Sequence, residues 1–187
     1  MATVDDLVQD AVRRMDSSIE HTRSEFNTVR TGRASAALLD RISIDYYGTA
    51  TPLKQLATIN VPEPRMLTIQ PFDPTSIKSI EKAIQESDLG LTPSNDGKMI
   101  RLPMPQPNEE RRMELVKVVR KLAEEGKVAV RNVRRDAMQR LQELTKNHEI
   151  GDDDERRAEE RVQKLTDEHT KTIDELLKHK EAEIMEV

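Results

Sequence analysis

Mostly apolar residues near the start of the chain recur at intervals of three or four positions. The series consists of Val8, Ala11, Met15, Ile19, Thr22, Phe26 and Val29. Because an α-helix has 3.6 residues per turn, this spacing predicts an amphipathic helix over residues 4–29. Thr3 and Asp5 are candidate N-cap residues, and the pattern stops near Gly32.

The pattern then changes to alternation, which is typical of β-strands. Apolar residues occupy every second position over residues 42–46, and Gly48 follows as a turn residue. Later in this part, two prolines separate two short apolar runs and mark a connection, since proline cannot donate a hydrogen bond to a ladder. The predicted elements are strands at 42–47, 56–61, 66–70 and 99–102 and a helix at 76–87.

A proline-rich segment, residues 103–107, ends this mixed unit. Its three prolines lack N–H donors and bias the residues before them toward extended geometry, which predicts a linker. The longest periodic stretch follows, a helix over residues 108–148 with Asn108 as N-cap and Gly151 as its end. A last helix is predicted from residue 152 to 185, with apolar residues at nearly heptad spacing.

Three long amphipathic helices that enclose a mixed unit predict an α+β fold. A helix with an exposed apolar stripe is unstable alone in water, so we expect an elongated antiparallel three-helix bundle formed by residues 1–30 and 106–187. Residues 31–105 would form a small inserted α/β domain. The chain crosses between these domains twice, which predicts a hinge with restricted directions. The expected hinge residues are Arg30, Thr31, Gly32, Arg33, Ala34, Pro103, Met104, Pro105, Gln106 and Pro107.

Composition narrows the class of protein. The 187 residues are 35% charged and 2% aromatic and include no Cys, so the cores must be aliphatic, and disulfide and thiolate chemistry are excluded. No run approaches about 18 apolar residues, and no signal peptide is recognisable. We therefore expect a cytoplasmic protein with no membrane partner. We also expect it to act as a monomer.

Charge is distributed unevenly along a chain whose net charge is −5. Residues 108–148 contain eleven Lys and Arg against seven Asp and Glu, whereas residues 149–187 contain seven against fourteen. The apolar face of the basic helix is predicted to contain Leu115, Val118, Val119, Leu122, Ala129, Val133, Ala137, Leu141 and Leu144. An acidic protein thus has one basic segment, on an amphipathic helix.

The cations of this helix form a stripe. On a helical wheel at about 100° per residue they lie within about 60° of Arg120, almost opposite the predicted apolar face, so we expect them to face solvent. Only Glu124 interrupts the stripe, and four cations with no acid lie between Lys127 and Arg135. The candidate RNA-binding residues are Lys117, Arg120, Lys127, Arg131, Arg134 and Arg135.

A charged stripe most often only keeps a helix soluble. Here the absence of interleaved acids, the abundance of arginine and the acidity of the rest of the chain favour phosphate binding. Core packing is the default expectation for the aromatic residues, Phe26, Tyr46, Tyr47 and Phe72. Without aromatic platforms for bases, structured RNA or a duplex backbone is the expected nucleic acid.

No catalytic motif accompanies these features. The four histidines lack the spacing of a metal site, and His169 lies on an apolar face, where a packed core histidine is expected. The acidic run 152–155 matches the dipole of a helix start better than a cation site. There is also no phosphate-binding glycine loop or nucleophile elbow. We predict a binding protein with no catalytic residues, metal or cofactor.

The chain resembles the bacterial-type ribosome recycling factors over nearly its whole length. The most distinctive matching motifs are Arg30-Thr31-Gly32-Arg33-Ala34-Ser35, Tyr46-Tyr47-Gly48, and Val128-Ala129-Val130-Arg131-Asn132-Val133-Arg134-Arg135-Asp136-Ala137. One departure is Ala36, where family members commonly have proline. This resemblance adds a specific function to the interpretation drawn from the residues.

The resemblance implies an L-shaped molecule that acts with elongation factor G and GTP to split the post-termination ribosome into subunits. It implies that the bundle contacts 23S ribosomal RNA of the large subunit and that the small domain meets the elongation factor. Arg131, Arg134 and Arg135 match the family's RNA-contacting arginines. A helical scaffold or co-chaperone, whose small domain binds a protein client, remains the alternative from another class.

Overall fold

The structure, a computed structural model, describes residues 3–186. The chain divides into two compact units. One, the bundle, is Met1–Arg30 with Glu109–Val187, and the other, the small domain, is Thr31–Asn108. Each unit has a hydrophobic core of its own, so each is described by itself.

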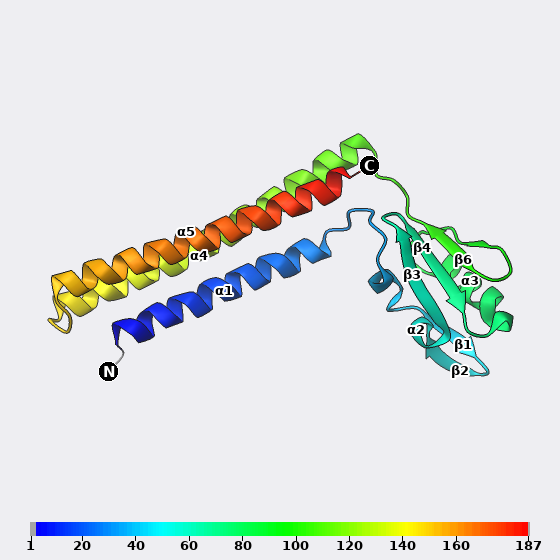
Figure 1. Ribbon diagram of the computed structural model, residues 1–187, viewed down its shortest axis with the longest axis horizontal. Helices are drawn as coiled ribbons and strands as arrows, with labels where there is room; N and C mark the ends of the chain where they lie inside the picture. The colour runs from blue at the N-terminus through cyan, green and yellow to red at the C-terminus, as the bar shows by residue number, and fades with distance from the viewer. Residues whose placement is uncertain (1–2, 187) are drawn as a thin grey trace. The chain divides into compact units, whose positions relative to one another are not determined.

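The bundle consists of three long helices, α1 (Val4–Thr28), α4 (Glu109–Lys146) and α5 (Asp152–Met185). Helices α1 and α5 run in the same direction and α4 runs against both (Figure 1). The three predicted helices are confirmed within two residues at each end, because their apolar stripes are long and regular. No helix within residues 3–186 is apolar enough over a sufficient length to cross a membrane.

Capping residues define the start of α1 and the turn between the other two helices. Thr3 is confirmed as the N-cap of α1: its Oγ1 accepts a hydrogen bond from Asp6 N at 3.1 Å, and Asp6 accepts one from Thr3 N at 2.9 Å. The prediction that Gly151 ends the long basic helix is wrong. The left-handed residue after α4 is His148, with φ 57°, and Gly151 is instead the N-cap of α5.

The core of the bundle is a long narrow seam. Its buried residues from α4 include Ala123, Gly126 and Val130, which the sequence prediction omitted, whereas the predicted core residue Val118 is 47% exposed. Gly126 lies against α1, where an added Cβ would be 3.3 Å from the Cβ and Cγ2 of Thr22 and still closer to its Oγ1. A glycine inside α4 therefore lets two backbones approach closely.

His169 of α5 is buried within this seam, as predicted. Its Nε2 lies 2.7 Å from Asp16 Oδ1 of α1, and its Nδ1 lies 2.6 Å from the carbonyl oxygen of Leu165. Both neighbouring atoms are hydrogen-bond acceptors, and these contacts tie α5 to α1.

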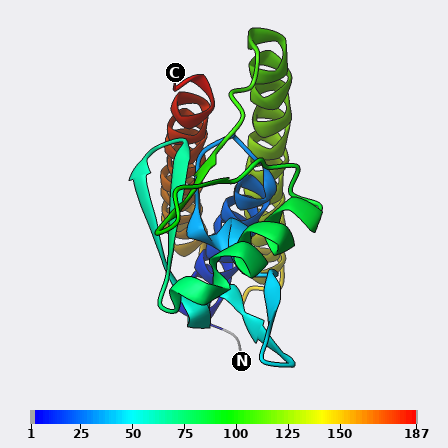
Figure 2. The ribbon, with the colours of Figure 1, turned by 90° about the vertical axis from the view of Figure 1, so that its right-hand side faces the viewer.

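The small domain combines a hairpin, a sheet and a helix (Figure 2). Its elements are the 3₁₀ turns Ala36–Leu39 and Pro74–Ser76, β1 (Ser43–Tyr46), β2 (Thr49–Pro52), α2 (Leu53–Leu56), β3 (Ala57–Glu63), β4 (Met66–Pro71), α3 (Ile77–Glu86), β5 (Ser94–Asn95) and β6 (Ile100–Pro103). Strands β1 and β2 form the hairpin, and the antiparallel sheet has the order β3-β4-β6-β5. Helix α3 contributes buried isoleucines to the same core as β4 and β6.

Several features of this domain differ from the sequence prediction, which also lacked the short elements α2 and β5. Pro62, expected in a connection, lies inside β3, where the register with β4 shifts between Asn60 and Glu63. This is tolerated because β3 is an edge strand, on which proline's missing donor breaks no ladder hydrogen bond. Strand β2 was not predicted, because its four residues Thr49–Pro52 are polar or small and show no alternation.

The aromatic residues also differ from expectation. Phe26 is buried, as predicted, and Tyr46 is half-buried, with its hydroxyl donating to Asp73 Oδ2 at 3.0 Å. Core packing was the wrong expectation for Tyr47 and Phe72, whose exposed fractions are 84% and 67%. Tyr47 is at the turn of the β1–β2 hairpin with φ 50°, where the strand alternation no longer directs its side chain inward.

Candidate nucleic-acid interface

The six predicted cations all lie on α4, and we call them the cation row: Lys117, Arg120, Lys127, Arg131, Arg134 and Arg135. Four are exposed, whereas Arg134 is half-buried and the side chain of Lys127 is only 19% exposed. The row therefore reaches solvent along most of its length, but one of its edges lies close to the helix packing.

The position of the buried residues on α4 explains why one edge of the row lies close to the helix packing. With Arg120 at zero on the helical wheel, the buried residues of α4 centre near about 260°, so they lie about 110° from the middle of the row rather than opposite. The predicted face was displaced because it included Val118, which is exposed, and Ala129, which is half-buried. Lys127 and Arg134 are the members closest to the true seam.

Three members of the row are paired with the protein's own carboxylates. Arg120 Nε donates to Glu181 Oε1 at 2.6 Å, and Lys127 Nζ donates to Asp174 Oδ1 at 2.9 Å. Two of these carboxylates come from α5, which a helical wheel of α4 alone does not represent. The expectation of a row without neighbouring acids is therefore wrong for its paired members.

The third paired member of the row, Arg131, contacts Glu124, which lies on α4 itself. Arg131 Nη1 donates to Glu124 Oε1 at 2.9 Å, and Lys127 Nζ lies 3.7 Å from the other oxygen. The hydrogen bond from Arg131 is the main cause that lowers the pKa of Glu124, and the hydrogen bond to Glu181 likewise raises the pKa of Arg120.

The other three cations are not engaged in this way. Within residues 3–186, no carboxylate lies within ion-pair distance of Lys117, Arg134 or Arg135. Arg135 is close enough to Asp136 to lower the pKa of that carboxyl, but the main cause there is the hydrogen bond from Arg14 of α1. The open members of the row are those best suited to receive an external anion.

A groove between α4 and α5 adds a residue that sequence reasoning missed. It has a volume of about 360 Å³. Its lining residues are Arg131, Arg134, Gln163, Thr166, Asp167, Thr170, Lys171 and Asp174. Lys171 is exposed on α5 and, within the described part of the chain, has no carboxylate within ion-pair distance. Only the antiparallel packing of two helices brings it beside Arg134, so no pattern within one helix could have identified it.

The paired residues reveal a register between the two helices. A step of seven residues along α4, from Arg120 to Lys127, corresponds to a step of seven back along α5, from Glu181 to Asp174. A further step leads to Arg134 and Asp167, which both line the groove. Asp167 there accepts a hydrogen bond from Gln163 Nε2 at 2.9 Å instead of an ion pair. Of these three opposed positions, the first two are closed by ion pairs and the third, Arg134 with Asp167, is open.

The expected hinge residues belong partly to the small domain. Pro103 ends β6 in its ladder with β4, and Met104 is buried, with its N–H donating to the Arg65 carbonyl at 2.8 Å. Ala34 is likewise fixed by a hydrogen bond of 2.7 Å to the Pro64 carbonyl. The prediction of a linker is therefore wrong for Pro103 and Met104, because a proline at the end of a strand leaves the rest of the ladder intact.

The remaining hinge residues bring the two crossings together. Gly32 has φ +79°, and an added Cβ there would lie 3.0 Å from Pro107 Cδ and 3.4 Å from the Pro105 carbonyl oxygen. Thr31 is buried, whereas Arg30, Arg33 and Gln106 are exposed. The close approach explains glycine at this position, and a hinge motion remains a prediction.

Comparison with known proteins identifies a family. The family model "Ribosome recycling factor" matches residues 22–185. A curated relative, the ribosome-recycling factor of Rubrobacter xylanophilus, is 59% identical over 187 residues and covers 100% of both chains.

Two solved structures are also similar to this chain. A solution structure of a ribosome recycling factor has a TM-score of 0.71 and 43% identity, covering 98% of each chain. The second is titled as models for the T. thermophilus ribosome recycling factor and the E. coli elongation factor G bound to the E. coli post-termination complex. It has a TM-score of 0.63 and 43% identity, covering 98% of this chain and 100% of that one.

Proposed function

Because the chain belongs to the ribosome recycling factor family, we propose that it dissociates the post-termination ribosome into subunits together with elongation factor G and GTP. The separated subunits, released from mRNA, are then available for another round of translation. Support for these partners comes from the similar solved structure, whose title places a recycling factor and elongation factor G on a post-termination complex.

The proposed contact of the bundle is with 23S ribosomal RNA of the large subunit. The observation that carries this proposal is the open side of the cation row, where Lys117, Arg134 and Arg135 have no ion-pair partner in the described residues. Arginine offers a planar fork that matches phosphate oxygens, and each phosphate that it neutralises releases counterions. Lys171 extends this charge onto α5.

The proposed role requires binding, not catalysis. The rod-like bundle would occupy space that an RNA bridge between the subunits needs, and the partner's GTP hydrolysis would supply the energy. Binding favours splitting only to the extent that it is stronger in the separated state than in the joined one. No group of three His, Cys, Asp or Glu side chains suitable for a metal occurs among residues 3–186.

The small domain is the proposed contact for elongation factor G. Two large aromatic side chains, Tyr47 and Phe72, are exposed on it, and such residues are enriched where proteins bind one another. The alternative function, a scaffold with a protein client, draws on the same two residues. It differs in leaving the cation row without a ligand.

Arg134→Ala tests the proposed contact. We expect the variant to bind large ribosomal subunits about five- to tenfold more weakly, since a charge-assisted contact to phosphate contributes roughly 1–1.5 kcal/mol. Co-sedimentation at several salt concentrations measures the affinity, and light scattering with elongation factor G and GTP measures splitting. Unchanged affinity in a folded variant contradicts the RNA contact.

Arg13→Ala is the matched control. It also removes an arginine side chain, here from an exposed position of α1 outside the cation row. We expect it to bind and split as the unmodified protein does. Wild-type protein that fails to sediment with large subunits at low salt supports the scaffold alternative instead.

A further inference from the structure

The carboxylates of α5 that face the cation row have a regular spacing. Asp167, Asp174 and Glu181 follow one another at intervals of seven residues. Glu181 and Asp174 pair with Arg120 and Lys127, and Asp167 lines the same groove as Arg134. We call these three the carboxylate ladder. Because a coiled pair of helices repeats its contacts every seven residues, one face of α5 presents all three acids to the row.

We propose that the carboxylate ladder is an internal competitor for the phosphates that the cation row binds. This inference rests on the proposed function, because it concerns the same RNA-binding surface. In the free protein the ladder holds Lys127 and Arg120, and RNA binding exchanges each carboxylate for a phosphate. The ladder thereby limits the affinity of a protein that must leave the ribosome after every cycle.

The geometry of the pairs supports an exchange. Arg120 is exposed while it contacts Glu181 at 2.6 Å, and Asp174 is exposed while it contacts Lys127 at 2.9 Å. Each pair thus has one exposed partner and one partly buried partner, Glu181 at 28% and Lys127 at 19% exposure. Solvent reaches both pairs, which limits the stability that each contributes, so a phosphate can replace the carboxylate. An RNA phosphodiester carries one negative charge on two free oxygens, as a carboxylate does, but it belongs to a dense row of like charges, and a cation that binds there also releases condensed counterions.

The open step of the ladder gives the exchange a starting point. Asp167 is hydrogen-bonded to Gln163, and no carboxylate lies within ion-pair distance of Arg134 in the described residues. Arg134 binds the first phosphate without breaking an ion pair. Lys127 and Arg120 then follow along the same face, at steps of about 10 Å given by seven residues of helix.

The exchange has a consequence for salt dependence. A cation that binds phosphate releases the RNA's counterions, but the carboxylate that it leaves attracts cations from solution. The net release of ions is therefore smaller than the number of row residues predicts. Removing a ladder carboxylate should raise both the affinity and the steepness with which salt weakens binding.

The test measures the dissociation constant for large ribosomal subunits between about 50 and 200 mM salt. For Asp174→Asn we expect about two- to fivefold tighter binding at low salt, which matches the free energy of one exposed ion pair. The same variant should show a steeper plot of log affinity against log salt. The double variant Asp174→Asn with Glu181→Gln should exceed either single change.

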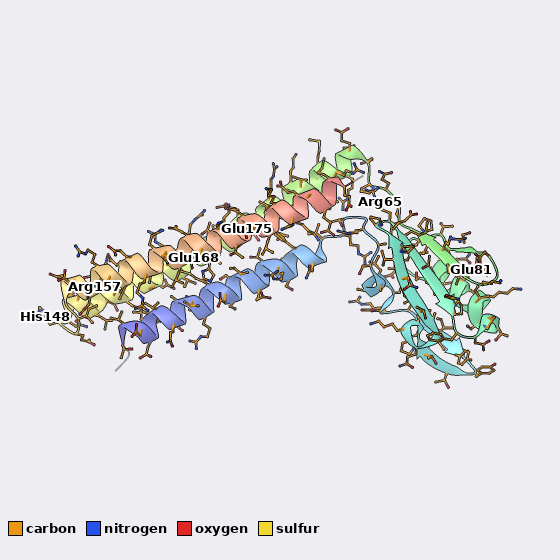
Figure 3. All side chains as sticks on the ribbon, in the orientation of Figure 1. Arg65, Glu81, His148, Arg157, Glu168 and Glu175 are labelled. Atoms are coloured by element: carbon orange, nitrogen blue, oxygen red, sulfur yellow. The ribbon has the colours of Figure 1, made fainter. Side chains whose placement is uncertain are left out.

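Glu175→Gln and Glu168→Gln are the matched controls. Each removes one negative charge next to a ladder residue, and both side chains are exposed on α5 (Figure 3). Neither has a cation within ion-pair distance in the described part of the chain. They therefore report the effect of net charge alone, while thermal melting by circular dichroism shows that every variant is folded.

Two outcomes overturn the inference. If Asp174→Asn and Glu175→Gln tighten binding equally, only net charge matters, and the ladder is not a competitor although the proposed RNA contact stands. If the unmodified protein fails to bind large subunits at any salt, both the proposed function and the ladder's role are overturned. Tighter binding and a steeper slope confined to the ladder variants support the inference.

Discussion

The two units of the protein bury their apolar side chains in different ways. Of the twelve largest side chains that are fully buried in the described residues, eight belong to the small domain, although its chain is the shorter. They are Leu39, Leu53, Leu67, Ile69, Ile80, Ile84, Ile100 and Leu102. The bundle instead buries several small residues, Ala11, Ala123, Gly126, Ala137 and Ala158. A compact aliphatic core thus contrasts with a thin seam.

Their charges differ as well. In the bundle, ion pairs such as Arg14–Asp136 and Lys127–Asp174 join different helices, whereas in the small domain Arg101–Asp96 joins residues close in sequence. A thin seam leaves much of each bundle helix exposed, and surface charges then help to fix how the helices align. Packing of large side chains should therefore dominate the stability of the small domain, and the close fit of small residues that of the bundle, where charge adds a smaller contribution.

The largest expected effect is in the small domain. Ile69→Ala empties a fully buried site in β4, a strand with neighbours on both sides. We expect the free energy of unfolding of this domain to fall by about 2–5 kcal/mol. Amide hydrogen exchange resolved by segment should become faster over residues 57–71 and should not change over residues 115–141. Val61→Ala, at an exposed position of β3, is the control, and an equal loss there would contradict the comparison.

A smaller effect is expected from overfilling the seam. Gly126→Ala gains about 1 kcal/mol of helix propensity but forces a methyl group against Thr22 of α1, so we expect a net loss of roughly 1–2 kcal/mol in the bundle. Chemical denaturation followed by the helical circular dichroism signal, which comes mainly from the bundle, measures this loss of stability. Thr22→Ala combined with Gly126→Ala should recover most of the stability, and failure of this rescue would place the strain elsewhere.

The smallest effect concerns charge and depends on pH. The hydrogen bond from Arg14 lowers the pKa of Asp136 below its ordinary value of 3.8. The carboxyl of Asp136 therefore binds protons less readily in the folded state than in the unfolded state. Above the ordinary pKa the ionised carboxylate stabilises the bundle, and this contribution is lost as the pH falls through the lowered pKa of the folded state. Asp136→Asn should therefore have a lower Tm than the unmodified protein at neutral pH, but the same Tm at about pH 2.

Glu168→Gln is the control for that measurement, since it removes the same charge from an exposed position of α5. Its Tm should follow that of the unmodified protein at every pH. A constant difference in Tm between Asp136→Asn and the unmodified protein, from neutral to acid pH, would show that the ion pair with Arg14 is not the cause.

The sequence predicted whatever repeats within one element. The seam of α1, from Val8 to Phe26, follows the 3.6-residue period, and its buried positions were all predicted except Leu7. The seam of α4 was displaced, because exposed Val118 stands beside buried Val119 and apolar character alone does not separate them. Tyr47 was misjudged for a related reason, since burial at a hairpin turn depends on what lies opposite.

The candidate site was predictable only in part. The sequence placed the six cations on one helix, and four of them are exposed, but their carboxylate partners depend on how α4 and α5 align, and neither helix encodes that alignment by itself. Lys171 was missed for the same reason. The seven-residue interval among Asp167, Asp174 and Glu181 was a visible signal, which becomes informative only when α4 is placed antiparallel to α5 (Figure 1).

The turn between those two helices, residues 147–151, has a consequence far beyond its own position. Its length sets which residue of α5 stands beside each residue of α4. Inserting one residue there would shift α5 along α4 and misalign every cation of the row with its carboxylate at once. The five residues of this turn thus govern the charge pattern of a face from Lys117 to Arg135, half of the 38 residues of α4.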